Sequence, residues 1–450
     1  MFDKHIADFN KNIIELREFI DLIASFLSEK QDEHDKRFNA LFMSSLVGKI
    51  LSIKTEWEPN EREEYENKKK KYDEEVLELY KKPVNIDVDV EKDEKGDPEK
   101  MGLKISFKSE NKIDDDIKKD LNSFGKSQVH ISILYKNSFI SLLSSVEWFF
   151  SQILHFYYDK FPESAGIQKK TMTLSDLKNF RTIEDAEKYL IDSKIEEVLR
   201  GSFETWLGIL KTELSLKLGY INQTENELVE IYQRRNLLVH NGGVVNSIYL
   251  SKVNENNRKN IKINDTLNIE KAYLDNAICK LQKAFILIAA ELWKKLDKDD
   301  TLRGDVLSEI VYANLLQSRW EISEGLSYFI INDAQLLPID KVIAQLNYWL
   351  SMKRQNKMDK IQEDIKKADF SDKKEILQLG LFSLREEKEL FFEKLPIALD
   401  SNQLNIERLE EFPIFEEMRQ TDEYKKFKLE SHYFKKPNVE IQKLDNIELN

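Results

Sequence analysis

The chain has 450 residues, of which 41% are hydrophobic and 34% are charged. This length exceeds the roughly 250–300 residues at which a single core stops growing, and the composition excludes wholesale disorder and a collagen-like fibre. The net charge of −13 argues against a protein that coats nucleic acid through bulk electrostatics. Only 13 glycines and 8 prolines are present for the tight turns of a sandwich or propeller, so helices are favoured.

The single cysteine, Cys279, excludes an intramolecular disulfide and a cysteine-cluster metal site, and it indicates a reducing compartment. The N-terminus lacks the pattern of a signal peptide, and no apolar run approaches the roughly 18 residues of a membrane span. We therefore expect a cytoplasmic protein without membrane contact. The histidines show no metal-ligand spacing and no phosphate-binding glycine loop is present, so we expect neither a metal nor a cofactor.

In the N-terminal part, the spacing of apolar residues is first that of a helix and then that of a β-strand. Residues 1–82 have apolar side chains at helical spacing and are predicted to be helical. Residues 84–108 contain two stretches of alternating apolar and polar residues, with Gly96 and Pro98 between them, which predicts a β-hairpin. Residues 1–128 are therefore expected to form a helical region that carries this β-hairpin.

Residues 129–300 are predicted to form a helical bundle. A long amphipathic helix is expected from Val129 to Tyr158, and Thr182 followed by Asp185 resembles a helix N-cap. Further helices are predicted over roughly 189–200, 202–219, Glu225–Val239 and Glu270–Leu296. This segment holds 23 basic and 23 acidic residues, so the whole net charge of −13 lies in the segments that flank it.

Residues 301–450 are predicted to be a succession of short helices. Helix pairs recur at roughly 30–35 residues, which is typical of helix-turn-helix units that stack into a solenoid. We interpret this region as a tetratricopeptide-like helical repeat, with a plain helical bundle as the alternative. Stacked repeats would offer a surface for a protein partner or another trigger.

Three side chains with chemical potential lie at the end of the helix predicted over Glu225–Val239. Asn236 and His240 are neighbours on one helix face, and Arg235 lies roughly 140° from His240, a gap that an arginine can span. Imidazole can accept a proton from a ribose 2′-OH or donate one to a leaving oxygen, and guanidinium can stabilise charge on a phosphate. Asn236 can orient the phosphate or the imidazole. Asn241-Gly242-Gly243 follows, where a glycine C-cap is expected.

The segment Arg235-Asn-Leu-Leu-Val-His240 resembles the R-x(4–6)-H motif of the HEPN superfamily. Similar proteins are helical bundles that dimerise, and many are metal-independent endoribonucleases in prokaryotic toxin and phage-defence systems. The resemblance covers residues 129–300, and it implies a catalytic Arg235, Asn236 and His240 and a homodimer through the central bundle. Some family toxins have a tyrosine two residues after the histidine, which a partner nucleotidyltransferase modifies; this chain has Gly242 there, so the resemblance does not extend to such a partner.

Two further residues are candidates for a supporting role. Glu147 could orient His240 or Arg235 across the bundle, and Arg234 could contact RNA phosphate, although a solvated glutamate and a surface arginine are the ordinary alternatives. The motif also has a purely structural interpretation. In that case Arg235 pairs with a carboxylate such as Glu230 or Glu147, and His240 caps the helix C-terminus, where a cation is favoured.

The sequence thus predicts a mainly α-helical protein and two functions of different class. The first is an endoribonuclease of a prokaryotic defence or stress system that cleaves RNA by 2′-OH attack, leaving a 2′,3′-cyclic phosphate. The second is a non-catalytic interaction or regulatory scaffold, in which the bundle dimerises and the repeats bind a partner. Loss of RNA cleavage in His240→Ala would distinguish them.

Overall fold

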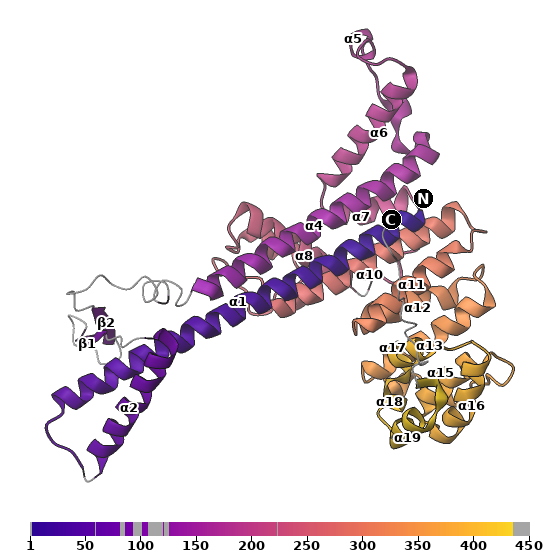
Figure 1. Ribbon diagram of the computed structural model, residues 1–450. Helices are drawn as coiled ribbons and strands as arrows, with labels where there is room; N and C mark the ends of the chain where they lie inside the picture. The colour runs from indigo at the N-terminus through magenta and orange to yellow at the C-terminus, as the bar shows by residue number, and fades with distance from the viewer. Residues whose placement is uncertain are drawn as a thin grey trace, which may run out of the picture. The chain divides into compact units, whose positions relative to one another are not determined.

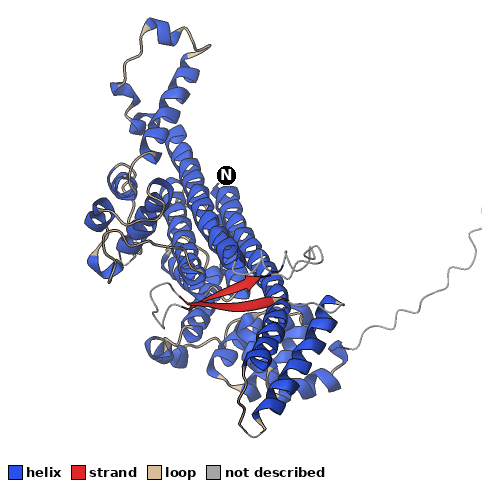
Figure 2. Ribbon diagram, turned by 90° about the vertical axis from the view of Figure 1, so that its left-hand side faces the viewer, coloured by secondary structure: helices blue, strands red, loops and turns tan. Residues whose placement is uncertain are grey.

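The protein is mainly α-helical, as the sequence predicts (Figure 2). The structure is a computed structural model that describes residues 2–58, 60–81, 86–92, 101–106, 120, 126–222 and 224–434. The long elements of the first 300 residues are α1 (Phe2–Ile53), α2 (Glu61–Tyr80), β1 (Asp87–Lys92), β2 (Met101–Ser106), α4 (Lys126–Lys160), α6 (Ile183–Leu199), α7 (Phe203–Thr212), α8 (Glu225–His240) and α10 (Lys271–Leu296). The shorter ones are η1 (Pro162–Ala165), η2 (Ile167–Lys169), α5 (Leu174–Leu177), α9 (Ser247–Lys252) and η3 (Glu255–Asn257).

The remaining elements are short helices, as expected for the C-terminal segment. They are α11 (Leu302–Leu316), α12 (Trp320–Asn332), α13 (Pro338–Arg354), η4 (Met358–Lys360), α14 (Gln362–Lys367), α15 (Glu375–Arg385), α16 (Lys388–Asp400), α17 (Ile406–Glu411), η5 (Pro413–Phe415), α18 (Glu416–Arg419), α19 (Asp422–Glu430) and η6 (His432–Phe434). Helices that follow one another pack together, for example α11 with α12, α12 with α13, and α15 with α16 (Figure 1). Whether they follow a tetratricopeptide pattern stays a prediction.

The chain forms two compact units. One comprises Met1–Ile13, Leu142–Thr266 and Asp275–Asn450, and the other comprises Ile14–Ser141 and Leu267–Leu274. The long helices α1, α4 and α10 each contribute residues to both. These units group residues that contact one another in space, whereas the three predicted segments are continuous stretches of sequence. The boundaries of the predicted segments therefore stay a prediction.

In the unit of residues 14–141, α1 and α2 enclose a small core of Ala40, Leu41, Val76, Tyr80 and Ile86. The strands β1 and β2 pair antiparallel, with a register that runs from Asp87 opposite Ser106 to Lys92 opposite Met101. The other residues of the predicted hairpin, 84, 85, 93–100, 107 and 108, lie outside the described residues.

The larger unit has an aromatic core that joins segments far apart in the sequence. Phe9 of α1 stacks on Phe149 of α4 with a centroid distance of 4.2 Å, and Phe150 stacks on Trp206 of α7 at 4.6 Å. Beside them, the buried Gln282 of α10 donates to the Asn10 side-chain oxygen at 2.8 Å. The first turns of the chain therefore belong to the same core as α4 and α10, a contact that the sequence does not predict.

One helix prediction was wrong at its end. The sequence predicts a helix over about 202–219, but α7 ends at Thr212, and Ser215 has a positive φ of 46°. Leu214, Leu216 and Leu218 are all buried although they are not helical. The backbone turns at Ser215, and the apolar residues alternate with polar ones in Leu214-Ser-Leu-Lys-Leu218, a spacing of two that a helix does not produce.

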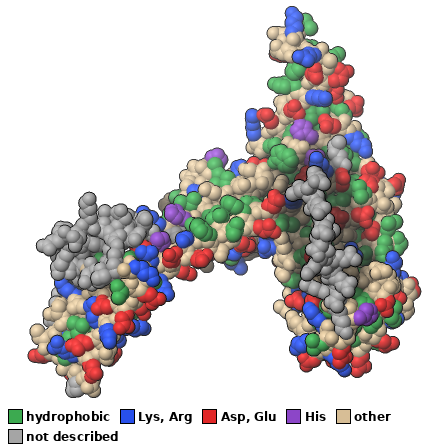
Figure 3. All heavy atoms as spheres, in the orientation of Figure 1, with side chains coloured by type: hydrophobic (Ala, Val, Ile, Leu, Met, Phe, Trp, Pro, Cys, Tyr) green, Lys and Arg blue, Asp and Glu red, His purple; other side chains and the backbone are tan. Residues whose placement is uncertain are grey.

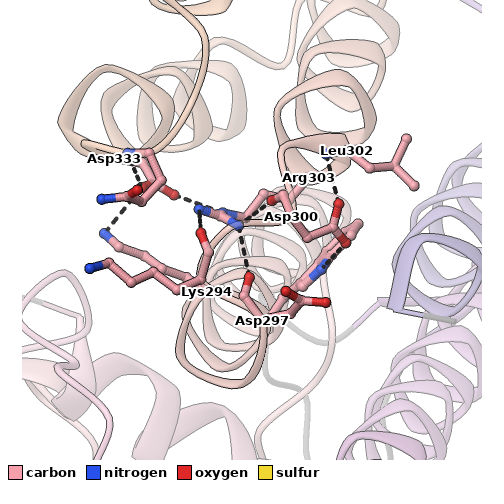
Figure 4. Close-up of polar contacts among 9 residues, drawn as sticks. Lys294, Asp297, Asp300, Leu302, Arg303 and Asp333 are labelled. Carbon is pink, nitrogen blue, oxygen red and sulfur yellow. Dashed lines mark hydrogen bonds and ion pairs between the residues drawn. The ribbon is translucent and has the colours of Figure 1, made fainter.

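Arg303, whose side chain is fully buried, stabilises the turn between α10 and α11 through the contacts drawn in Figure 4. Its Nε donates to Oδ2 of the buried Asp333 at 2.8 Å, at the end of α12. Its terminal nitrogens donate to three backbone carbonyl oxygens after α10, those of Asp297, Lys298 and Asp300. Arginine offers five donors in one plane, so this single side chain of α11 satisfies carbonyls of the turn after α10 and joins the turn to the end of α12.

Basic and acidic side chains are interspersed on the face shown in Figure 3. The negative net charge is therefore not gathered into one acidic surface on that face. In the lining of the candidate site, by contrast, positive side chains outnumber negative ones.

Candidate functional site

The candidate site is built on α8, which lies against α4 and α7 (Figure 1). Its apolar side is buried and includes Leu228, Ile231 and Leu237. The helix ends as the sequence predicts: Gly242 and Gly243 have φ values of 61° and 90°, where a side chain would be strained. The Gly243 amide donates back to the Leu237 carbonyl oxygen at 3.1 Å, as in a glycine-terminated helix.

Arg235 is fixed by two hydrogen bonds at this end of α8. Its Nη2 donates to Glu147 Oε1 of α4 at 2.9 Å, and its Nη1 donates to Asn236 Oδ1 at 3.1 Å. About a quarter of each charged side chain is exposed, 24% for Arg235 and 27% for Glu147. Burial raises the pKa of Glu147, and the positive charge of Arg235 offsets part of that rise. An anion in the site would compete with Glu147 for the same guanidinium.

His240 is the last residue of α8 and its side chain is exposed. Within the described part of the chain, neither ring nitrogen has a hydrogen-bond or ion-pair partner. The imidazole is therefore accessible to a ligand that enters from solvent. The contact between Arg235 and Glu147 fits both the catalytic and the structural interpretation of the motif.

Arg234 forms an ion pair inside the protein, and its contact with RNA phosphate stays a prediction. Its Nε donates to Glu230 Oε1 at 2.7 Å, and only 12% of its side chain is exposed. The Tyr249 hydroxyl of α9 donates to the same carboxylate oxygen at 2.7 Å. These buried contacts attach α9 to α8, and the sequence had no signal for them beyond the helical spacing of Glu230 and Arg234.

The motif residues line one cleft of about 480 Å³. Glu147, Arg235, Asn236 and His240 all contribute to its wall, so the structure brings together four of the five candidates; Arg234 is not part of the lining. Arg200 and Lys252 line the same cleft, and Glu147 is the one acidic residue in the lining. In a chain with a net charge of −13, this cleft carries more positive than negative side chains. Such a balance favours an anionic ligand.

Sequence reasoning did not single out three polar lining residues that bear on ligand binding, Tyr232, Arg200 and Lys252. Tyr232 lies three residues before Arg235 on the same helix, and Arg200 lies before the Gly201 turn. Lys252 lies on α9, which was not predicted. A signal for α9 was present, because Asn246 is an N-cap whose side-chain oxygen accepts from the Tyr249 amide at 2.9 Å.

Among the described residues, no group of three or more His, Cys, Asp and Glu side chains could hold a metal ion. In the same part of the chain, every helix is too short or too polar to cross a membrane. Comparisons with family models, curated proteins and solved structures found no significant match to this chain.

Proposed function

We propose that the protein is a metal-independent endoribonuclease whose active site is the cleft at the end of α8. The observation that carries this proposal is the presence of Arg235, Asn236 and the exposed His240 in one predominantly basic cleft. These groups match the needs of RNA transesterification, in which the ribose 2′-oxygen attacks the adjacent phosphorus. The resemblance of the motif to HEPN ribonucleases supports the same assignment.

In the proposed reaction a bond forms between the 2′-oxygen and phosphorus while the bond from phosphorus to the 5′-oxygen breaks. The 2′-OH loses a proton and the leaving 5′-oxygen gains one, and His240 carries out one of these transfers. Arg235 stabilises the negative charge that grows on the phosphate oxygens, and Asn236 orients the phosphate or the imidazole. The products are a 2′,3′-cyclic phosphate and a 5′-OH end.

Exposed apolar side chains around the motif support the further proposal of a two-fold homodimer. Trp148 follows Glu147 in the sequence and is 52% exposed, and Val239 precedes His240 and is 47% exposed. Ile248, which lines the cleft, is 60% exposed. An isologous interface at this surface would place two motifs together, so that a second imidazole could carry out the other proton transfer. The HEPN arrangement of the bundle is part of this proposal.

The prokaryotic defence or stress role and the tetratricopeptide-like character of the C-terminal helices are likewise proposals. In this scheme the C-terminal helices contact a protein partner or trigger that controls cleavage. The support is the succession of packed short helices from α11 to α16.

The test is incubation of the purified full-length protein with total RNA in the presence of EDTA. We expect cleavage to 5′-OH ends, and at least a hundredfold lower rate for His240→Ala and for Arg235→Ala, since general acid–base catalysis contributes about 10²–10⁴-fold and one electrostatic stabiliser of the transition state about 10²–10³-fold. His155→Ala is the matched control, because His155 is a partly exposed histidine of α4 outside the cleft. Equal rates for wild type and His240→Ala would refute the proposal and favour the scaffold function, whose supporting observation is the ion pair between Arg235 and Glu147.

A further inference from the structure

A buried hydroxyl in the wall of the cleft has no partner among the described residues. Tyr232 is 6% exposed, and its ring stacks on Phe203 at a centroid distance of 4.7 Å. It lines the same cleft as Arg235 and His240, yet its hydroxyl oxygen makes no hydrogen bond within the described part of the chain. Leaving a buried donor unsatisfied costs about 1–3 kcal/mol, so the position calls for an acceptor that enters the cleft.

The hydroxyl group can serve only as a neutral donor or acceptor. Burial raises the pKa of Tyr232 well above its ordinary value, and the nearby charge of Glu147 raises it further, while Arg235 opposes the shift. Within the described residues Glu147 accepts no hydrogen bond from Tyr232; its Oε1 accepts from Nη2 of Arg235. The Nε of Arg235 is a second buried donor without a partner among the described residues. Two unsatisfied donors in one wall favour an oxyanion ligand.

Lys252 supplies a positive charge to the same cleft from another element. It is the last residue of α9, it is exposed, and it has no ion-pair partner within the described residues. The Asn246 N-cap and the bond from Tyr249 to Glu230 hold α9 in place. Arg200 lines the cleft as well, although its guanidinium binds Glu196 at 2.8 Å. Lys252 is therefore a lining cation outside the motif that has no ion-pair partner among the described residues.

We propose that Tyr232 and Lys252 bind phosphates of an RNA strand. The Tyr232 hydroxyl donates to the phosphate held by Arg235, and Lys252 pairs with a neighbouring phosphate. This inference rests on the proposed function and deepens it, since it makes the substrate a strand with at least one phosphate beyond the one that is cut. A mononucleotide would leave Lys252 without a partner.

The test measures binding of a labelled single-stranded oligoribonucleotide to the full-length protein across a salt series. All variants carry His240→Ala so that binding is measured without cleavage. Tyr232→Phe is expected to weaken binding about tenfold, the value of one hydrogen bond. Lys252→Ala is expected to make the slope of log K against log salt shallower by about 0.7, as one phosphate contact with a single strand requires.

Matched controls are available for both variants. Tyr220→Phe removes another buried hydroxyl without a partner among the described residues, but Tyr220 does not line this cleft. Lys259→Ala removes an exposed lysine that follows α9 and does not line the cleft either. Both controls should bind RNA as the parent protein does. Tyr232→Phe should also leave the melting temperature unchanged, because no internal hydrogen bond is lost.

The outcomes separate this inference from the proposed function. Loss of affinity in Tyr232→Phe and Lys252→Ala supports the inference even if the wild-type protein fails to cleave, a result that would reject only the nuclease function. Cleavage by the wild type together with unchanged binding in both variants would overturn the inference alone. A lower melting temperature in Tyr232→Phe would show that the hydroxyl has an internal partner, and absence of any RNA binding would overturn both proposals.

Discussion

Replacing Arg303 by methionine tests whether one buried side chain stabilises the turn between α10 and α11. Arg303 and Asp333 have no exposed surface, and their charged groups lie 2.8 Å apart. Methionine has a similar length but no donors, so Asp333 would keep a buried charge whose nearest remaining cation is Lys294, 3.7 Å away. Three backbone carbonyl oxygens would lose a donor as well.

The expected loss of stability follows from these contacts. Removing one partner of a buried ion pair costs about 3–5 kcal/mol, and for a unit of a few hundred residues this corresponds to a melting temperature lower by about 5–10 °C. Urea unfolding followed by tryptophan fluorescence measures the difference. The signal comes from six tryptophans, of which Trp293 donates to Asp300 at 2.9 Å in the same turn. Arg62→Met is the control, since Arg62 forms an exposed pair with Glu66 and should change stability by less than about 0.5 kcal/mol.

The pH dependence gives a second check on the same variant. Burial would raise the pKa of Asp333, but the hydrogen bond and charge of Arg303, together with the Gln335 amide and the charge of Lys294, outweigh it, so the pKa lies below its ordinary value. The stability from this pair is therefore present above the unfolded pKa of about 3.9 and is lost as the pH falls through the folded pKa. The deficit of Arg303→Met should shrink below about pH 4. A deficit under about 1 kcal/mol at pH 7, or one that stays constant down to pH 3, would refute the reasoning.

Three further outcomes are expected. Phe9→Ala should lower stability by about 3–5 kcal/mol in denaturant titrations, because Phe9 is 1% exposed and stacks on Phe149; a loss below about 1 kcal/mol would mean that the first helical turns do not belong to this core. His240→Ala should leave the melting temperature within about 1 °C of wild type, since the side chain is exposed, and a clear decrease in a calorimetric scan would favour the structural interpretation of the motif. Light scattering should find a dimer for the wild type and a monomer for Trp148→Glu, whereas a wild-type monomer at micromolar concentration would contradict the proposed interface.

The sequence by itself determined the features that depend on neighbours along the chain. The mainly helical class, the end of α8 at Gly242 and Gly243, and the Thr182 capping box with Asp185 are all confirmed. These features follow from helical spacing and from caps within four residues, which act within one or two turns. The same locality explains the error after Thr212, where the alternation of buried leucines was read as the continuation of a helix.

Only the tertiary structure decided which distant side chains share the candidate site. Glu147 and Arg235 are 88 positions apart in the sequence. The sequence left Glu147 and Glu230 as possible partners of Arg235. Because α8 packs on α4, Arg235 pairs with Glu147, and Glu230 pairs with Arg234 instead. Lys252 joins the cleft because a buried hydrogen bond attaches α9 to α8. The physical reason is that helix periodicity defines which face is apolar but not which helix covers it, so contacts between remote residues depend on how the whole core packs.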